Sequence, residues 1–132
     1  MLTALIFAGL GAGSCGTDPT CIVVSADCAP LYEPSFDNVY SRTLSQGCAA
    51  SGSSCHSSEG AKAGLSFSSA DQSYALLLGE DDGIARVSAG DAGCSILIQR
   101  LESDSDPMPP GQALSEAERC AIIQWIDQGA KR

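Results

Sequence analysis

With 132 residues, sixteen acidic and seven basic side chains, the chain has the size of one domain and a formal net charge of −9. This charge makes nucleic acids and anionic lipid surfaces poor partners, because few cations are present to neutralise phosphates. A protein with a basic docking patch would instead be attracted. Aromatic residues make up only 5% of the chain, and a small domain with so thin a core usually needs disulfides, a metal or a cofactor to stay folded.

The N-terminal segment and the seven cysteines indicate export to an oxidising compartment. Residues 2–14 carry no charge, which suits the apolar core of a signal peptide, and they are too few to span a bilayer. The small residues before Cys15 look like a bacterial lipoprotein cleavage box. We therefore expect a signal peptide at 1–14 and a lipidated Cys15, with the protein periplasmic or at the cell surface and touching the membrane only through its lipid. The alternative is a plain secretory signal that leaves Cys15 as a thiol.

The first predicted elements are a tether and a helix. Residues 15–34 have no periodicity and hold three prolines, so they are predicted to form a tether, in which Cys21 and Cys28 can close a small disulfide loop. Residues 35–46 place apolar side chains at helical spacing, and Gly47 is expected to end this helix. The apolar stripe consists of Phe36, Val39, Tyr40 and Leu44.

Two short helices are predicted beyond a flexible stretch at 48–64. One begins after Ser69, which can form a capping box with Gln72, and ends at Gly79. Its apolar residues are Tyr74, Leu77 and Leu78. The next is expected to be capped by Asp91. Its apolar face consists of Cys94, Leu97, Ile98 and Leu101.

The last helix is the clearest element, with a capping box of Ser115 and Glu118 and a stop at Gly129. Its apolar face consists of Cys120, Ile122, Ile123, Trp125 and Ile126. Residues 102–111 hold three prolines and must form a loop, with Met108 at its centre. No strand pattern appears, so the predicted fold class is all-α. Long loops between short helices are unusual unless something such as a large planar ligand holds them.

His56 is the only histidine in the chain, and it directly follows Cys55. In c-type haem attachment two thiols add to the vinyl groups and the histidine beside the second thiol binds the iron. Here the first thiol would be Cys48, with six residues between the cysteines where two are usual. The alternative is a Cys48–Cys55 disulfide with an incidental histidine.

Met108 offers a second haem ligand, because a thioether suits haem iron opposite imidazole. It lies between two prolines, which reduce the entropy lost on holding the sulfur in place. The alternative is a methionine that fills a core gap, although one surrounded by proline, glycine and acids is an odd core residue. Arg86 and Arg100 could pair with haem propionates or could simply be surface residues.

A series of short motifs runs through residues 35–132. They are Phe36-x-x-Val39, Cys55-His56, Gly64-Leu65-Ser66-Phe67, Gly90-Asp91, Ser95-x-Leu97-x-x-Arg100-Leu101, Met108-Pro-Pro-Gly111, Leu114-Ser115-x-x-Glu118 and Trp125-Ile126-x-x-Gly129-Ala130. This order resembles the class I cytochrome c domains of the planctomycete type. The resemblance implies a cytochrome c-like fold, with short helices and long loops wrapped around one covalent haem c. It also implies His56 and Met108 as axial ligands, with the haem attached through both Cys48 and Cys55 or through Cys55 alone.

With one cysteine assigned to lipid and two to haem, four remain for disulfides. They are Cys21, Cys28, Cys94 and Cys120. A Cys94–Cys120 bond would clamp the helices that frame the methionine loop, and it leaves Cys21 with Cys28. Other pairings stay open, because four cysteines allow three arrangements.

The sequence therefore predicts a monohaem c-type cytochrome that carries single electrons by outer-sphere transfer between redox proteins. We do not expect an enzyme, because the chain has no second histidine, no Cys-x-x-Cys pair and no glycine-rich phosphate loop. The alternative is a haem-free, disulfide-stapled lipoprotein module that binds a partner or acts as a spacer.

Overall fold

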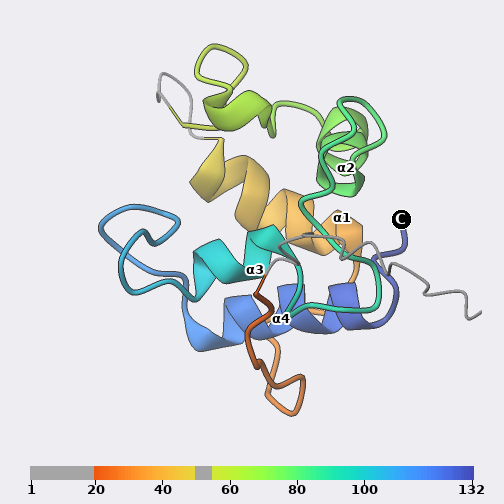
Figure 1. The fold of residues 1–132 in the computed structure, drawn as a ribbon, viewed down its shortest axis with the longest axis vertical. Helices are drawn as coiled ribbons and strands as arrows, with labels where there is room; N and C mark the ends of the chain where they lie inside the picture. Colours follow the sequence, from red (N-terminus) through yellow and green to blue (C-terminus); the bar gives the residue numbers. More distant parts are fainter. Residues whose placement is uncertain (1–19, 50–54) are drawn as a thin grey trace, which may run out of the picture.

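The computed structural model describes residues 20–49 and 55–132, and within these ranges it contains helices and no strand. This confirms the all-α class. The elements are α1 (Phe36–Val39), the π-helix η1 (Tyr40–Cys48), the 3₁₀ turn η2 (Lys62–Gly64), α2 (Ala70–Leu78), α3 (Ile96–Leu101) and α4 (Glu116–Asp127), shown in Figure 1. The expected signal peptide at 1–14 and the lipid site at Cys15 lie outside the described residues.

The first helix begins as predicted but ends later. The Ser35 hydroxyl accepts a hydrogen bond from the Asn38 N–H at 3.4 Å, which caps α1. The expected stop at Gly47 is wrong, because the chain continues as the π-helix η1 to Cys48. Its wider turn ends with the Ala49 N–H bonded to the Leu44 carbonyl at 3.0 Å, five residues back. The spacing of apolar residues in the sequence does not distinguish a π-helical turn from an α-helical turn. Because the helix continues, Cys48 is its last residue and not the first residue of a loop.

Helices α2 and α4 are confirmed near their predicted limits, because their signals are local. The Ser69 hydroxyl accepts from the Gln72 N–H at 3.4 Å, and Gly79 ends α2 with a φ of 77°. A Cβ on Gly79 would lie 2.7 Å from the Ala85 nitrogen, so only glycine fits there. At α4 the Ser115–Glu118 capping box is complete.

Helix α3 begins later than predicted. The Asp91 carboxylate does not cap it and instead accepts from the Cys94 N–H at 3.1 Å, closing a separate turn. The helix starts at Ile96 after an extended Ser95. A short acidic side chain makes the same bond in a turn as in a cap, so the sequence signal is ambiguous. Cys94 therefore lies in this turn and not on the helix.

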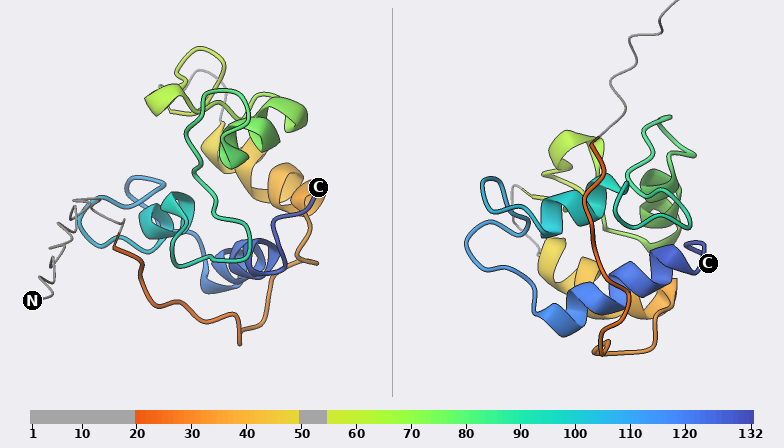
Figure 2. Two further views of the ribbon diagram at one scale, coloured as in Figure 1. Left: turned by 45° about the vertical axis from the view of Figure 1, so that its right-hand side comes forward. Right: turned by 60° about the horizontal axis from the view of Figure 1, so that its bottom comes forward.

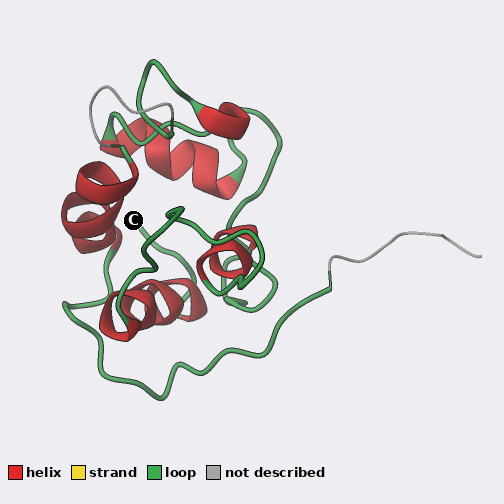
Figure 3. Cartoon of the chain, turned by 90° about the vertical axis from the view of Figure 1, so that its left-hand side faces the viewer, coloured by secondary structure: helices red, strands yellow, loops and turns green. Residues whose placement is uncertain are grey.

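The core forms where the first and last helices cross, with α2 beside them. The Phe36 ring lies 5.6 Å from the Trp125 ring and 5.0 Å from the Tyr74 ring, centroid to centroid. Two views in Figure 2 show α1 and α4 side by side, and Figure 3 shows how much of the remaining chain is loop. No helix in the part of the chain that is described is long and apolar enough to cross a membrane.

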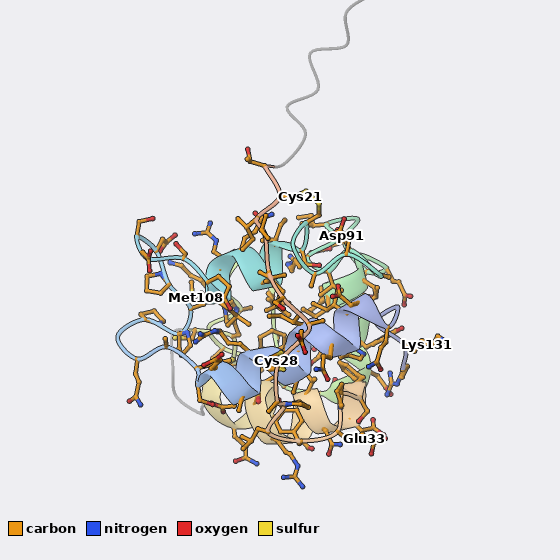
Figure 4. All side chains as sticks on the ribbon, turned by 90° about the horizontal axis from the view of Figure 1, so that it is seen from below. Cys21, Cys28, Glu33, Asp91, Met108 and Lys131 are labelled. Atoms are coloured by element: carbon orange, nitrogen blue, oxygen red, sulfur yellow. A yellow bond between two sulfur atoms is a disulfide. The ribbon has the colours of Figure 1, made fainter. Side chains whose placement is uncertain are left out.

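Residues 20–34, here called the strap, lie along α4 and reach the turn before α3 (Figure 4). The Ile22 N–H bonds to the Gly93 carbonyl at 3.1 Å. At α4, the Gln124 side-chain amide donates to two strap carbonyls, those of Ala26 and Cys28, at 2.9 and 3.1 Å. The segment predicted to be a tether is thus part of the packed domain.

Two disulfides hold the strap, and their pairing corrects the sequence-based expectation. The bonds join Cys21 to Cys94 and Cys28 to Cys120, so the expected pairs Cys94–Cys120 and Cys21–Cys28 are wrong, although the four cysteines are the expected ones. The reason is that the strap packs against the domain instead of folding back on itself. The strap is therefore bonded to Cys94 before the methionine loop and to Cys120 after it, whereas the sequence had suggested that these two cysteines bond directly to each other.

We predict that replacing Cys28 and Cys120 together with alanine lowers the free energy of unfolding by about 2–5 kcal/mol, because the bond closes a long loop in the unfolded chain. Urea titration of the oxidised protein measures this loss. Peptide mapping without reduction should recover Cys21 with Cys94 in both wild type and variant. Recovery of a peptide that joins Cys94 to Cys120 would contradict the pairing.

Candidate functional site

A cavity of about 340 Å³ opens between the end of η1, α3 and the methionine loop. Most of its wall is apolar. The apolar side chains are Leu44, Ala63, Leu65, Phe67, Ile96, Leu97, Leu101, Leu114 and Ile122. Cys48, His56 and Met108 line the same cavity, whereas Cys55 is not among its lining residues. Tertiary structure thus brings together three of the four residues singled out from the sequence, from positions up to sixty residues apart.

The His56 ring is held in one orientation and one tautomer. Its Nδ1 lies 3.0 Å from the Leu65 carbonyl oxygen. A carbonyl only accepts, so Nδ1 carries the proton and Nε2 keeps a free lone pair. The backbone reinforces this arrangement, because the Phe67 N–H donates to the His56 carbonyl at 2.7 Å. A histidine held in this way is prepared to bind a metal through Nε2.

Met108 is half-buried on a loop that is tied down at both ends. Its N–H bonds to the carbonyl of Arg100 in the last turn of α3 at 3.0 Å. From α4, the Arg119 guanidinium donates to the Glu102 carboxylate at 2.8 Å and to the Leu114 carbonyl. The thioether packs against the edge of the core and also lines the cavity. The loop therefore presents an apolar, neutral donor at a fixed place.

Cys48 and Cys55 are both free thiols, so the alternative of a disulfide between them is not formed. The backbone still joins the two ends of this loop, because the His56 N–H bonds to the Cys48 carbonyl at 3.2 Å. Burial raises the pKa of the Cys48 thiol from 9.0 to about 11, and the nearby Cys55 and Glu118 add to the shift.

Arg86 lines the cavity too, but it is not a free cation. Its side chain is 7% exposed and its guanidinium contacts the Asp82 carboxylate at 2.8 Å. Hydrogen bonds from Arg86 and from the Ile84 N–H hold the pKa of Asp82 below its usual range. Arg100, the other arginine considered from the sequence, is half-exposed and pairs with Asp106.

Sequence reasoning missed two parts of this site. It did not single out the Leu65 carbonyl that orients His56, although Leu65 belongs to one of the motifs. It also treated Arg86 as a surface residue or a propionate partner. Neither role has a sequence signal, because both are contacts to backbone carbonyls, which any residue type can offer.

The residues at the cavity fit a haem. An imidazole with a free Nε2 and a thioether are one of the pairs of protein donors that fill both axial positions of haem iron, and the apolar wall suits a porphyrin. The described residues contain no group of three or more His, Cys, Asp or Glu side chains that could hold a metal ion. Haem iron needs no such group, because the porphyrin supplies the remaining ligands.

We predict slow alkylation of Cys48 in the haem-free protein. At pH 8 a pKa of about 11 in place of 9.0 leaves roughly a hundredfold less thiolate. Timed iodoacetamide labelling with mass spectrometry measures the rate at Cys48, and the urea-unfolded chain is the control. Equal rates in the folded and unfolded protein would contradict the burial.

The raised pKa of Cys48 also affects the pH dependence of stability. Because the unfolded chain loses the Cys48 thiol proton first, the free energy of unfolding should fall as the pH rises from 9.0 to about 11.

Comparison with known proteins gives one match. The family model described as Planctomycete cytochrome C matches residues 53–112, a segment that includes His56 and Met108 but not Cys48. No curated protein matches the chain, and no solved structure does. This is the family that the motifs led us to expect, and the match covers 60 of the 132 residues.

Proposed function

We propose that this chain is a monohaem c-type cytochrome that carries single electrons by outer-sphere transfer. The observation that carries the proposal is the cavity in which the only histidine and Met108 meet among apolar side chains. Both residues lie in the segment that matches the cytochrome family.

His56 and Met108 would be the axial ligands of the bound haem. The haem supplies a one-electron iron couple. His56 would bind through Nε2, since its Nδ1–H is taken by the Leu65 carbonyl. Met108 would bind through Sδ, and a thioether in this position raises the reduction potential. With both axial positions filled by side chains, no position is left for a substrate, and we therefore propose an electron carrier and not an enzyme.

Cys48 and Cys55 are proposed as the two covalent attachment points. Cys48 lines the cavity at the end of η1, and Cys55 immediately precedes the histidine. Both thiols are free for this reaction. Conversion of Cys48 to a thioether also removes a buried group that titrates, which fits its apolar surroundings.

We also propose that the protein is exported, lipidated at Cys15 and held at a bacterial membrane by that lipid, in the periplasm or at the cell surface. Two disulfides support an oxidising compartment. The net charge of −9 favours redox partners with a basic docking patch, and electron exchange with them should slow as salt is added.

The haem proposal predicts an absorption spectrum of a low-spin haem that survives denaturing extraction of the protein made in a host with cytochrome c maturation. Met108→Ala should keep the haem, lower the reduction potential and open a coordination position, because a soft axial ligand is lost. His56→Ala should abolish the low-spin spectrum. Spectroscopy with potentiometric titration measures these changes.

Met108→Leu is the matched control for packing, since it keeps the apolar volume and removes only the sulfur. It should reproduce the lower potential of Met108→Ala. Haem spectra of all three variants identical to wild type would contradict the ligand assignment. Wild-type protein with no absorbance beyond the protein band would favour the haem-free, disulfide-stapled module, for which the strap is the supporting observation.

For the anchor, we predict that the mature protein purified from membranes begins at Cys15 and carries the mass of attached acyl chains. Cys15→Ala should release it into the soluble fraction, because one covalent lipid site is lost. Intact-mass spectrometry and fractionation measure this. A mature N-terminus elsewhere, without lipid, would overturn the anchor and leave the haem proposal unaffected.

A further inference from the structure

The Leu65 carbonyl that orients His56 is carried by a strained turn. Ala61 and Ala63 have φ values of 33° and 55°, and Gly64 has a φ of 72°. Alanine in this left-handed region is unfavourable, because its Cβ crowds the backbone. Bonds to residues nearby in the chain help to close the turn: the Gly64 N–H donates to the Ala61 carbonyl and the Lys62 N–H to the Cys55 carbonyl, both at 2.9 Å. A turn of this kind persists when its surroundings hold it.

Arg86 contacts this turn from the cavity wall. Its Nη2 donates to the Ala63 carbonyl at 3.0 Å and to the Asp82 carboxylate at 2.8 Å. Its Nη1 donates to the Leu76 carbonyl in α2 at 2.8 Å. The planar guanidinium thus joins the turn to α2 and to an acidic loop at the same time, with donors on separate nitrogens at a fixed spacing, whereas a lysine carries all its donors on one nitrogen.

Arg86 is itself fixed by the two helices that flank it. Its N–H bonds to the Leu77 carbonyl near the end of α2 at 2.9 Å. Its carbonyl accepts from the Leu97 N–H at the start of α3, also at 2.9 Å. The guanidinium therefore holds the turn to a rigid support, and does not move with the turn.

We propose that Arg86 is a positioning residue for the His56 imidazole. It ties the Ala63 carbonyl to α2 and so fixes the left-handed turn whose Leu65 carbonyl accepts the Nδ1–H bond. The proposal rests on the haem-binding function above. It assigns to Arg86 a role through backbone geometry and not through its charge.

The two roles predict different outcomes for Arg86→Lys, which keeps the charge and loses the planar fork. If position matters, the Nδ1–H bond weakens and His56 becomes a poorer donor to iron. The oxidised state is then less stabilised and the reduction potential rises. If only charge matters, Arg86→Lys leaves the potential unchanged.

The experiment uses the full-length, haem-loaded protein in its reduced, diamagnetic state. Because His56 is the only histidine, its Nδ1–H gives one imidazole signal whose exchange with deuterated water is followed by NMR. In Arg86→Lys we expect this exchange to be about tenfold faster, the factor that corresponds to the loss of one hydrogen bond, together with a higher potential. The double variant with Ala63→Gly should recover much of the protection, since glycine adopts the left-handed turn without strain.

Arg100→Lys is the matched control, because Arg100 lines the same cavity and carries the same charge but makes no bond to the turn. It should leave the Nδ1–H exchange unchanged. If Arg86→Lys does not fold, Asp82→Asn is used instead, because it removes the ion pair that holds the Arg86 guanidinium. Faster Nδ1–H exchange in this variant is then the expected result. Haem-loaded Arg86→Lys with wild-type exchange and potential would overturn the positioning role alone. A wild-type protein without covalent haem would overturn the proposed function instead.

Discussion

The contact between Phe36 and Trp125 is the one on which the rest of the structure depends. It joins the first helix of the domain to the last, and Tyr74 from α2 completes the cluster. Segments between these helices also contribute to the core, through side chains such as Leu77 and Ile98. The intervening chain is mostly loop, and the helices that punctuate it are short. The core therefore holds the helices together, and the long loops around it depend on further contacts.

Disulfides and hydrogen bonds hold several of these loops in addition to apolar packing. The strap connects the turn before α3 with α4 through two disulfides. Arg119 holds both ends of the methionine loop, and Arg86 holds the turn at 61–65. The methionine loop and the turn at 61–65 both line the cavity. Such contacts offset part of the conformational entropy that is lost when a loop is ordered.

The cavity lies where the core meets these loops. Helix η1 contributes one wall and ends at Cys48, while α3 and the methionine loop contribute the others. Apolar side chains from these segments line this space, and some of them, such as Leu44 and Leu101, also belong to the core. Among the described residues that line this space, His56 supplies an imidazole, Met108 a thioether and Cys48 a thiol. A thioether and an imidazole with its proton on Nδ1 suit a redox centre in an apolar site.

Local signals let the sequence determine much of this on its own. The limits of α2 and α4 follow from Ser69, Gly79 and the Ser115–Glu118 box, because each cap is a bond within a few residues. The absence of helix at 102–111 follows from proline chemistry in the same way. The candidate ligands His56 and Met108 could be named because their residue types are rare in this chain.

Tertiary structure decided whatever depends on contacts between distant segments or on backbone geometry. Asp91 makes a bond that serves a turn as well as a cap, so the start of α3 could not be inferred from it. The disulfide pairing depends on where the strap lies, and the strap has no periodicity to predict its path. The orientation of His56 depends on the Leu65 carbonyl and, through the turn, on Arg86. A backbone carbonyl is present at every residue, and only the folded chain selects which one accepts the bond.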